Sequence, residues 1–323
     1  MSRLKTVRNY ILVTLLPVAM FLVVYAIYPQ TAKLSQLLTI FQQAILPAIL
    51  AWGLYFNITA GNWDFSLGAN ALISGIVSCN IADRLGLGLI PFILICIAIA
   101  TAIGAVNAIL FYVTKIPTLI ISIGLLFVLE SLSGIVFNGS GAIAKSEWVI
   151  FGMMPYNIVV GVVFFLLALY LYKFNVLGYH VRAVGENSAV AQSHGIDVYM
   201  VKVKALIVAG FFSGVYAFTT LGSVGILSAT SGMTTTSQVF DGMMCYFIGL
   251  VLVKYANCIF TIYIGSVFLQ MIKFAILVIG FNTSYQRVFI SLMVIALIAV
   301  NNRQLIADEL LQRKRRKASL QAD

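Results

Sequence analysis

The sequence predicts an all-α integral membrane protein with about ten transmembrane helices and both termini in the cytoplasm. Hydrophobic residues make up 61% of the 323 residues and charged residues only 9%. The mean hydropathy is +1.03, far above what a soluble core requires. Apolar runs of about 20 residues recur, and a helix of that length crosses about 30 Å of hydrocarbon. The runs are continuous and do not alternate with period two, so they predict helices and not barrel strands.

The predicted spans follow one another in a single transmembrane domain, residues 1–323. The first span has the apolar character of a signal peptide, but its core is long and no small-x-small cleavage site follows, so we interpret it as a retained helix. Glycine, proline and asparagine inside the later spans are normal in membranes, where small residues allow close approach of helices. In order, the spans are Tyr10–Tyr28, Leu38–Thr59, Phe65–Ile81, Leu89–Val113, Leu119–Phe137, Tyr156–Tyr172, Val201–Leu221, Val239–Val253, Ile259–Gly280 and Arg287–Val300.

Basic residues fix the orientation of these spans. If the spans alternate, fifteen of the 20 basic residues fall on one side, which the positive-inside rule assigns to the cytoplasm. That side carries the N-terminus (residues 1–9), a loop (residues 175–200) and a basic tail (residues 303–323). The opposite side has Lys33, Arg84, Lys145 and Arg287, and Lys273 lies within a span. The net charge of +10 is therefore mostly a topology signal, and the tail is interpreted as solvated near anionic lipid, with no role in nucleic-acid binding.

Nothing in the sequence predicts a catalytic centre or a metal site. Cys79, Cys96, Cys245 and Cys258 lie in or beside spans without C-x-x-C spacing, so we expect buried thiols and no disulfide. Residues 139–146, GSGAIAKS, fall short of a phosphate-binding loop because Ala144 stands where a second glycine must let backbone amides wrap the phosphates. We therefore predict a non-catalytic chain with no cofactor of its own.

A polar island, GENSAVAQSHGI, interrupts the apolar spans at residues 185–196. It predicts a short helix that begins near Asn187, contains small residues and ends at Gly195. Residues 178–202, GYHVRAVGENSAVAQSHGIDVYMVK, resemble the cytoplasmic loop of the permease subunits of carbohydrate-type ABC importers, the ribose, galactose, xylose and autoinducer uptake group. The resemblance implies that loop 175–200 holds the helix that couples to a separate ATPase subunit. The implied coupling residues are Gly185, Glu186, Asn187, Ala189 and Gly195.

Three further stretches resemble the same family: NWDFSLG (residues 62–68), GAVNAILFYVTKIPTLIISIG (residues 104–124) and SYQRVFISLMVIALIAVNNRQ (residues 284–304). The chain also departs from the family pattern. Of a paired-glycine stretch in the eighth span, only Asp241 and Gly249 remain, and Glu130 stands where a basic residue is common. The lost glycines raise the question of how closely the eighth and ninth spans pack, and they fit a chain that pairs with a different permease.

Each polar residue inside a span is expected to have a structural or functional role, because placing a charge in hydrocarbon costs free energy. The candidates for the translocation pathway or for a structural role are Asp64, Ser66, Asn107, Glu130 and Asp241. We expect Asp64 and Asp241 to cap the N-termini of the third and eighth spans, and Asn107 to bond between helices or to touch substrate. Glu130 is expected to pair with a base, either Lys273 or one on a second permease. Gly210-x-x-x-Gly214 predicts a close helix contact.

By resemblance, the chain is the permease subunit of an ATP-driven importer in the bacterial cytoplasmic (inner) membrane. The solute is small and polar, with a monosaccharide as the first expectation, and moves by alternating access. The implied partners are an ATPase subunit that binds ATP and Mg²⁺, a second permease subunit (a homodimer before a heterodimer), an extracytoplasmic binding protein and membrane lipid. The alternatives are a secondary carrier coupled to ions through Asp64, Glu130 or Asp241, and an ABC permease for nucleosides or branched-chain amino acids.

Overall fold

The computed structural model describes residues 2–30 and 33–280 and, beyond them, residues 285, 288, 289, 292, 293, 295 and 296. The predicted helical fold class is confirmed. In chain order the α-helices are α1 (Ser2–Ile27), α2 (Ser35–Gln43), α3 (Ile45–Thr59), α4 (Leu67–Arg84), α5 (Leu89–Thr114), α6 (Thr118–Ile135), α7 (Tyr156–Lys173), α8 (Val176–Glu186), α9 (Ser188–Ser193), α10 (Val198–Val224), α11 (Thr236–Leu252) and α12 (Cys258–Ile279). Two short 3-10 helices, η1 (Val136–Gly139) and η2 (Val149–Gly152), and an antiparallel pair of strands, β1 (Ala142–Ile143) and β2 (Ile226–Leu227), complete this part of the chain.

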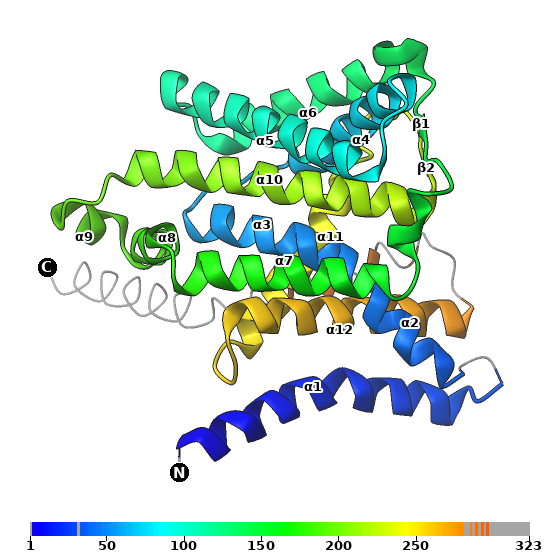
Figure 1. The fold of residues 1–323 in the computed structure, drawn as a ribbon. Coiled ribbons are helices and arrows are strands. Elements are labelled where there is room, and N and C mark those ends of the chain that lie inside the picture. Colours follow the sequence, from blue (N-terminus) through cyan, green and yellow to red (C-terminus); the bar gives the residue numbers. More distant parts are fainter. Residues whose placement is uncertain are drawn as a thin grey trace, which may run out of the picture.

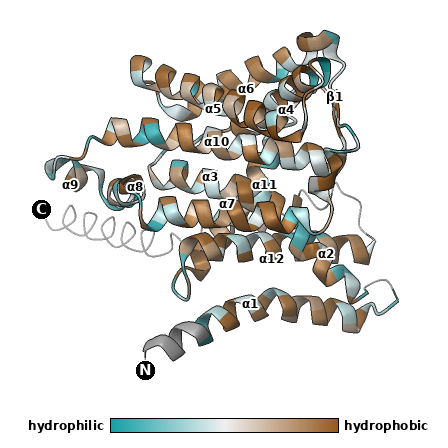
Figure 2. Ribbon diagram, in the orientation of Figure 1, coloured by the Kyte–Doolittle hydropathy of each residue, from teal (hydrophilic) through white to brown (hydrophobic). Residues whose placement is uncertain are grey.

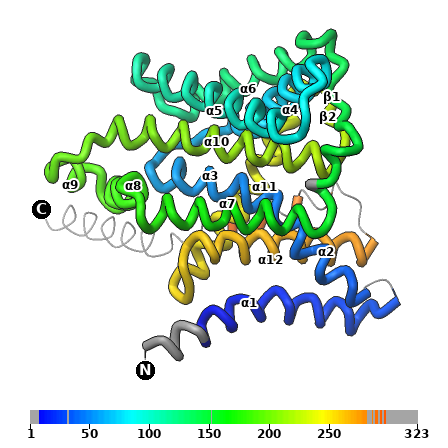
Figure 3. The backbone as a smooth tube through the Cα atoms, in the orientation of Figure 1, coloured from blue at the N-terminus to red at the C-terminus, as the bar shows by residue number. Residues whose placement is uncertain are grey.

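The long helices run side by side in a layered bundle (Figure 1). α4, α5 and α6 lie at one edge, and α3, α10 and α11 fill the middle. α3 buries 12 of its 15 residues, because α10, α11 and α12 all pack around it. The tube in Figure 3 shows α1 at the opposite edge, where it contacts α12. The core therefore sits between α3 and α10, and α1 is a peripheral helix.

Glycines set the closest helix contacts. A Cβ atom on Gly210 would lie 2.8 Å from the Cα atom of Gly104, and one on Gly214 would lie 2.8 Å from the Cα atom of Ile97. The predicted close contact at Gly210-x-x-x-Gly214 is thereby confirmed, with α5 as the partner helix. α11 and α12 also pack closely, since a Cβ atom on Gly265 would lie 2.4 Å from the carbonyl oxygen of Cys245. The eighth and ninth spans thus remain in tight contact without the lost glycines.

Nine of the predicted spans correspond to helices, and the tenth, residues 287–300, lies largely outside the described residues. Seven helical stretches are long and apolar enough to cross a membrane on length and composition within the part of the chain that the structure describes. α4 and α11 are not among them: most of α4 is buried inside the protein, so its residues need not be lipid-soluble, and α11 is shorter. The second span is two helices, α2 and α3, and the third begins at Leu67, not Phe65.

Both ends of the bundle carry hydrophilic residues (Figure 2). Hydrophobic residues cover the flanks of the helices, and hydrophilic residues gather around α8 and α9 at one end and near β1 at the other (Figure 2). The start of α1 lies at the same end as α8 and α9 (Figure 1). At the opposite end, Lys145 forms an ion pair with Asp83, at 3.0 Å. The charge pattern predicts that the α8–α9 end faces the cytoplasm, and on that prediction we refer to it as the cytoplasmic end.

Cysteines introduced by Lys115→Cys and Lys145→Cys are expected to react from opposite sides of the membrane with an impermeant thiol reagent. Lys115 follows α5 at the cytoplasmic end, and Lys145 lies beyond α6. The four native cysteines, all buried and free, are replaced first. Loss of the Lys145–Asp83 pair costs little because both side chains are largely solvent-accessible. Labelling of both positions from the same side would contradict the orientation.

Candidate functional site

The loop 175–200 forms two short helices at the cytoplasmic end, α8 and α9, and the polar island contains the end of α8 and all of α9. Asn187 separates them, and its side-chain oxygen accepts hydrogen bonds from the N–H groups of Ala189 and Val190, both at 3.1 Å. This is the N-cap that starts α9. Gly195 follows α9 with a φ of +82°, a left-handed conformation that glycine adopts without strain. The predicted short helix is therefore present: α9 runs from Ser188 to Ser193, between its N-cap Asn187 and the left-handed Gly195.

The outer surface of this loop is open. Glu186, Asn187 and Ala189 are exposed, as are Val190 and Gly195, whereas Ala191 is buried. A Cβ atom on Gly195 would meet no atom within 4 Å. The predicted coupling residues thus lie together on one surface that nothing else in the described part of the chain covers.

The base of the same loop is fixed to the bundle. A Cβ atom on Gly178 would lie 2.3 Å from the carbonyl oxygen of Leu171, and one on Gly185 would lie 2.4 Å from that of Thr59. Arg182 donates to the carbonyl oxygen of Tyr172 and stacks over the Tyr172 ring. α8 is consequently held against the ends of α7 and α3 by backbone contacts that leave no room for side chains.

Residues 60–66 join α3 to α4 without helical structure. Along this segment the side chains of Asn62, Asp64 and Ser66 are buried, whereas Trp63 is 40% exposed and Phe65 is partly exposed. Alternation with period two is the mark of an extended backbone. The segment therefore turns its polar side chains to the interior and its aromatic side chains to the surface. Sequence reasoning missed Trp63 and Phe65, although the alternation is visible in NWDFS.

The segment rises along α6 into the bundle. The N–H of Trp63 donates to the hydroxyl of Thr118 at 3.1 Å, and the N–H of Phe65 donates to that of Ser122 at 3.2 Å. These hydroxyls, one helical turn apart, satisfy backbone groups that have no intrahelical partner. α4 then begins at Leu67, whose carbonyl oxygen accepts from a hydroxyl halfway along α10. Its N-terminus thus lies inside the membrane.

Asp64 is the centre of a buried polar cluster. Its Oδ1 atom accepts from the N–H and the hydroxyl of Ser66, at 3.0 and 2.6 Å. Its Oδ2 atom accepts from the amide groups of Asn107 at 3.1 Å and Asn57 at 3.5 Å. Four donors and the adjacent N-terminus of α4 compensate the buried carboxylate. The structure thus joins three predicted residues, Asp64, Ser66 and Asn107, and adds Asn57, whose only signal was an amide in an apolar span.

Residues 228–235 form a second non-helical segment, between β2 and α11. The carboxylate of Glu130, in α6, binds the end of this segment next to the first turn of α11. It accepts from the N–H of Met233 at 2.8 Å, the N–H of Thr235 at 2.9 Å and the hydroxyl of Thr235 at 2.7 Å. The expectation that Lys273 is the partner of Glu130 is wrong: Lys273 pairs with Asp241, and the Glu130 carboxylate binds donors at a helix N-terminus.

The N-termini of α4 and α11 meet. A Cβ atom on Gly68, in the first turn of α4, would lie 2.3 Å from the carbonyl oxygen of Thr235. Residues 60–66 lead into α4 from the cytoplasmic end of the bundle, and residues 228–235 lead into α11 from the opposite end. Each N-terminus has a buried carboxylate, Asp64 for α4 and Glu130 for α11. Irregular backbone at this depth is typical of membrane proteins that enclose a water-lined path.

Asp241 is the fifth predicted polar residue, and its expected role as a helix cap is wrong. It lies in the second turn of α11 and forms an ion pair with Lys273 of α12, with 2.5 Å between Oδ2 and Nζ. Both side chains are partly exposed. Two opposite charges that meet across a helix hairpin neutralise each other and reduce the cost of their depth.

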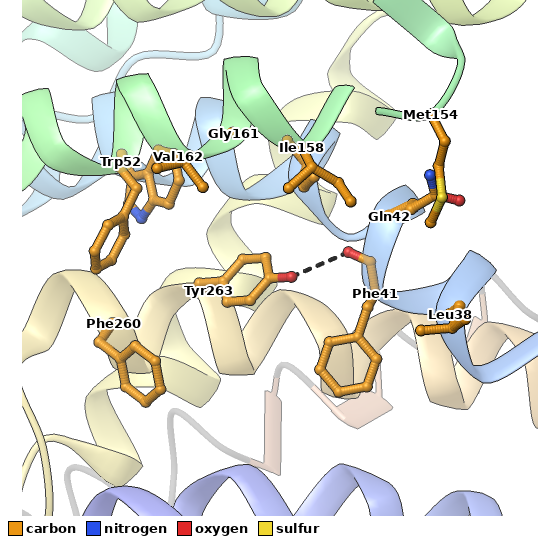
Figure 4. A pocket seen from close by; sticks show the side chains of 12 residues that line it. Leu38, Phe41, Gln42, Trp52, Met154, Ile158, Gly161, Val162, Phe260 and Tyr263 are labelled. Carbon is orange, nitrogen blue, oxygen red and sulfur yellow. Dashed lines mark hydrogen bonds between the residues drawn. The ribbon is translucent and has the colours of Figure 1, made fainter. Parts of the chain in front are cut away.

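The cavities of the described residues differ in character. The one between α2, α7 and α12 is lined almost wholly by apolar side chains, and its Tyr263 hydroxyl is bonded to the carbonyl oxygen of Phe41 (Figure 4). A cavity of about 770 Å³ lies at the cytoplasmic end between residues 61–63, the α5–α6 turn and α9, and its walls include Trp63, Gln192 and Lys202. Of these two cavities, the second has the polar lining that a hydrophilic solute requires.

Comparisons with known proteins agree with this architecture. The family model described as "Branched-chain amino acid transport system / permease component" matches residues 36–298. The ribose import permease protein RbsC of Escherichia coli strain K12 is 22% identical over 295 residues, which cover 87% of this chain and 90% of that protein. The D-allose transport system permease protein AlsC of the same strain is 25% identical over 81% of this chain and 82% of its own length.

A further relative is the fructose import permease protein FruF of Bifidobacterium longum strain NCC 2705, 23% identical over 81% of this chain and 76% of its own length. No solved structure matches the chain. The family match covers both non-helical segments, the cytoplasmic loop and all helices from α3 to α12. The chain therefore belongs to the family of permease components of branched-chain amino acid transport systems.

Proposed function

We propose that this chain is the permease subunit of an ATP-driven importer for a monosaccharide in the bacterial cytoplasmic membrane. The observation that carries the proposal is the cytoplasmic loop, whose exposed helix α9 stands on a base fixed by Gly178 and Gly185. A rigid base under an exposed helix suits a surface that receives force from another protein. The ribose, allose and fructose permeases among the relatives support the solute class.

The proposed partners supply what this chain lacks. An ATPase subunit binds ATP and Mg²⁺ and docks on α9, an extracytoplasmic binding protein delivers the sugar, and a second copy of this chain completes the path. We favour a homodimer because both reasons for a second, different permease are weakened: the Glu130 carboxylate accepts three hydrogen bonds within its own chain, and α11 and α12 pack closely without the lost glycines.

An ion-coupled carrier is the less favoured function. Such a carrier needs a carboxylate that gains and loses a proton or cation during transport. Asp64 and Glu130 are 1% exposed and accept four and three hydrogen bonds within the chain, and Asp241 is bound to Lys273. Uptake by proteoliposomes that contain this chain without an ATPase, driven by a pH gradient alone, would overturn the proposal.

Gly195→Val is expected to leave membrane insertion intact and to abolish substrate-stimulated ATP hydrolysis by the assembled transporter. The left-handed backbone at Gly195 disfavours a β-branched residue by roughly 1–2 kcal/mol, and the strain falls on the end of α9. There is open space around the residue, so steric damage to the bundle is not expected. Gly195→Asn is the matched control, because asparagine tolerates this conformation, and it should retain at least half of the activity, a rough estimate from that tolerance. Equal activity of both variants would contradict the coupling role.

A further inference from the structure

One face of the chain exposes polar backbone and side chains at membrane depth. Seven of the eleven residues from 228 to 238 are serine or threonine, and Ser231, Gly232, Met233, Thr234 and Ser237 are exposed. Glu130, which binds Met233 and Thr235, lies twelve residues into α6, or about 18 Å from its cytoplasmic end at 1.5 Å per residue. Exposed non-helical backbone at such a depth does not face lipid, so this surface faces a partner protein or a water-filled space.

Two aromatic rings continue this surface toward the cytoplasm. Phe240 of α11 is 48% exposed, and its ring lies 5.6 Å from the ring of Phe65, at 60°. Phe65 comes from the segment 60–66, whose aromatic side chains point outward. The pair therefore joins the surfaces of the two non-helical segments near the middle of the bundle.

Trp63 extends the surface to the cytoplasmic end. It lies two residues before Phe65, on the same side of the extended segment, and its side chain lines the polar cavity of about 770 Å³. α9 forms another wall of this cavity through Ser188 and Gln192. A continuous surface thus runs from the outer segment past the two phenylalanines to the cavity beside the coupling helix.

We propose that this surface, formed by Thr234, Ser237, Phe240, Phe65 and Trp63, is the half of the sugar path that one chain supplies. The inference rests on the proposed function and deepens it. Hydroxyls on the outer part replace water around a polyhydroxylated solute, and the aromatic rings receive its C–H faces, the usual combination in sites for amphipathic small molecules. A second copy of this chain supplies the facing wall, because one open face does not separate water from lipid. Asp64, Ser66, Asn107 and Glu130 position the surface from behind.

The test compares cysteines introduced by Ser237→Cys and Phe240→Cys with one introduced by Val163→Cys, in a chain without the four native cysteines. Val163 is the matched control because it lies in α7 and is 52% exposed on an apolar flank. A charged methanethiosulfonate reagent reacts with thiolate in water, so the first two positions are expected to react at least about tenfold faster than the third. Labelling in detergent shows that the control thiol is present. Thr234→Cys replaces Ser237→Cys if that variant does not assemble.

The same proteoliposomes, with the ATPase and the binding protein, are assayed for uptake of ribose, allose and fructose. ATP-dependent uptake that modification of Phe240→Cys abolishes, and modification that is slower during turnover with sugar, would support the inference. ATP-dependent uptake together with reaction at Ser237→Cys as slow as at Val163→Cys would overturn the inference and leave the proposed function standing. If uptake does not depend on ATP, the proposed function fails whatever the labelling rates.

Discussion

Glu130→Ala is expected to abolish uptake and to reduce the stability of the protein more than any substitution of an exposed carboxylate. The change removes the acceptor of three buried donors, the N–H groups of Met233 and Thr235 and the Thr235 hydroxyl. Each buried donor left without a partner costs about 1–3 kcal/mol, and the N-terminus of α11 also loses its compensating charge. The start of α11 then has no fixed position relative to α6.

The measurement is the midpoint of thermal unfolding in detergent, followed by size-exclusion chromatography, together with uptake. Glu130→Gln is expected to be intermediate, because one oxygen still accepts while the amide nitrogen faces an N–H group. Glu147→Ala removes an exposed carboxylate and should change the midpoint little. A midpoint for Glu130→Ala equal to that for Glu147→Ala would show that the cap contributes nothing.

Gly68→Ala is the second change with a large expected effect. The added Cβ atom would lie 2.3 Å from the carbonyl oxygen of Thr235, a backbone atom that moves only if α4 and α11 separate. Overpacking of a core costs about 1–3 kcal/mol, and here the displaced groups are the two helix N-termini. We expect a lower unfolding midpoint and a loss of most of the uptake.

Gly124→Ala is the matched control for this experiment. Gly124 also lies in a helix, but a Cβ atom there would meet nothing within 4 Å, so alanine should stabilise α6 slightly through its higher helix propensity. The contact between α4 and α11 would be unimportant if both alanine variants unfolded at the same temperature and transported equally.

Local signals predicted local structure well. The order Asn, small residues, glycine in the polar island predicts a capped helix, and α9 begins at the Asn187 cap and ends before a left-handed Gly195. Such features depend on the chemistry of a few neighbouring residues, so the sequence contains the information they need. The apolar runs predicted the membrane helices for the same reason.

Features that depend on tertiary register were mispredicted. Lys273 was predicted as a partner of Glu130. However, α11 and α12 form a hairpin in which Gly249 contacts Ile262. Counting back from that contact along both helices places Asp241 within one turn of Lys273. The role of Glu130 was missed because two of its three donors are backbone N–H groups, which every residue except proline carries. The start of α4 at Leu67 was predicted two residues too early, because apolar character alone does not distinguish an extended segment from a first helical turn.

The glycine contacts give the permease a mechanical property. Movement of α8 would press on the backbone of Thr59 through Gly185, and residues 60–66 would carry it to α4, where Gly68 presses on the backbone of Thr235. At each contact the nearest atom to the glycine is a backbone carbonyl oxygen, which leaves no room for a larger side chain at the glycine position. The contacts therefore connect the cytoplasmic surface to the start of α11 along one path, in which residues 60–66 are the non-helical part.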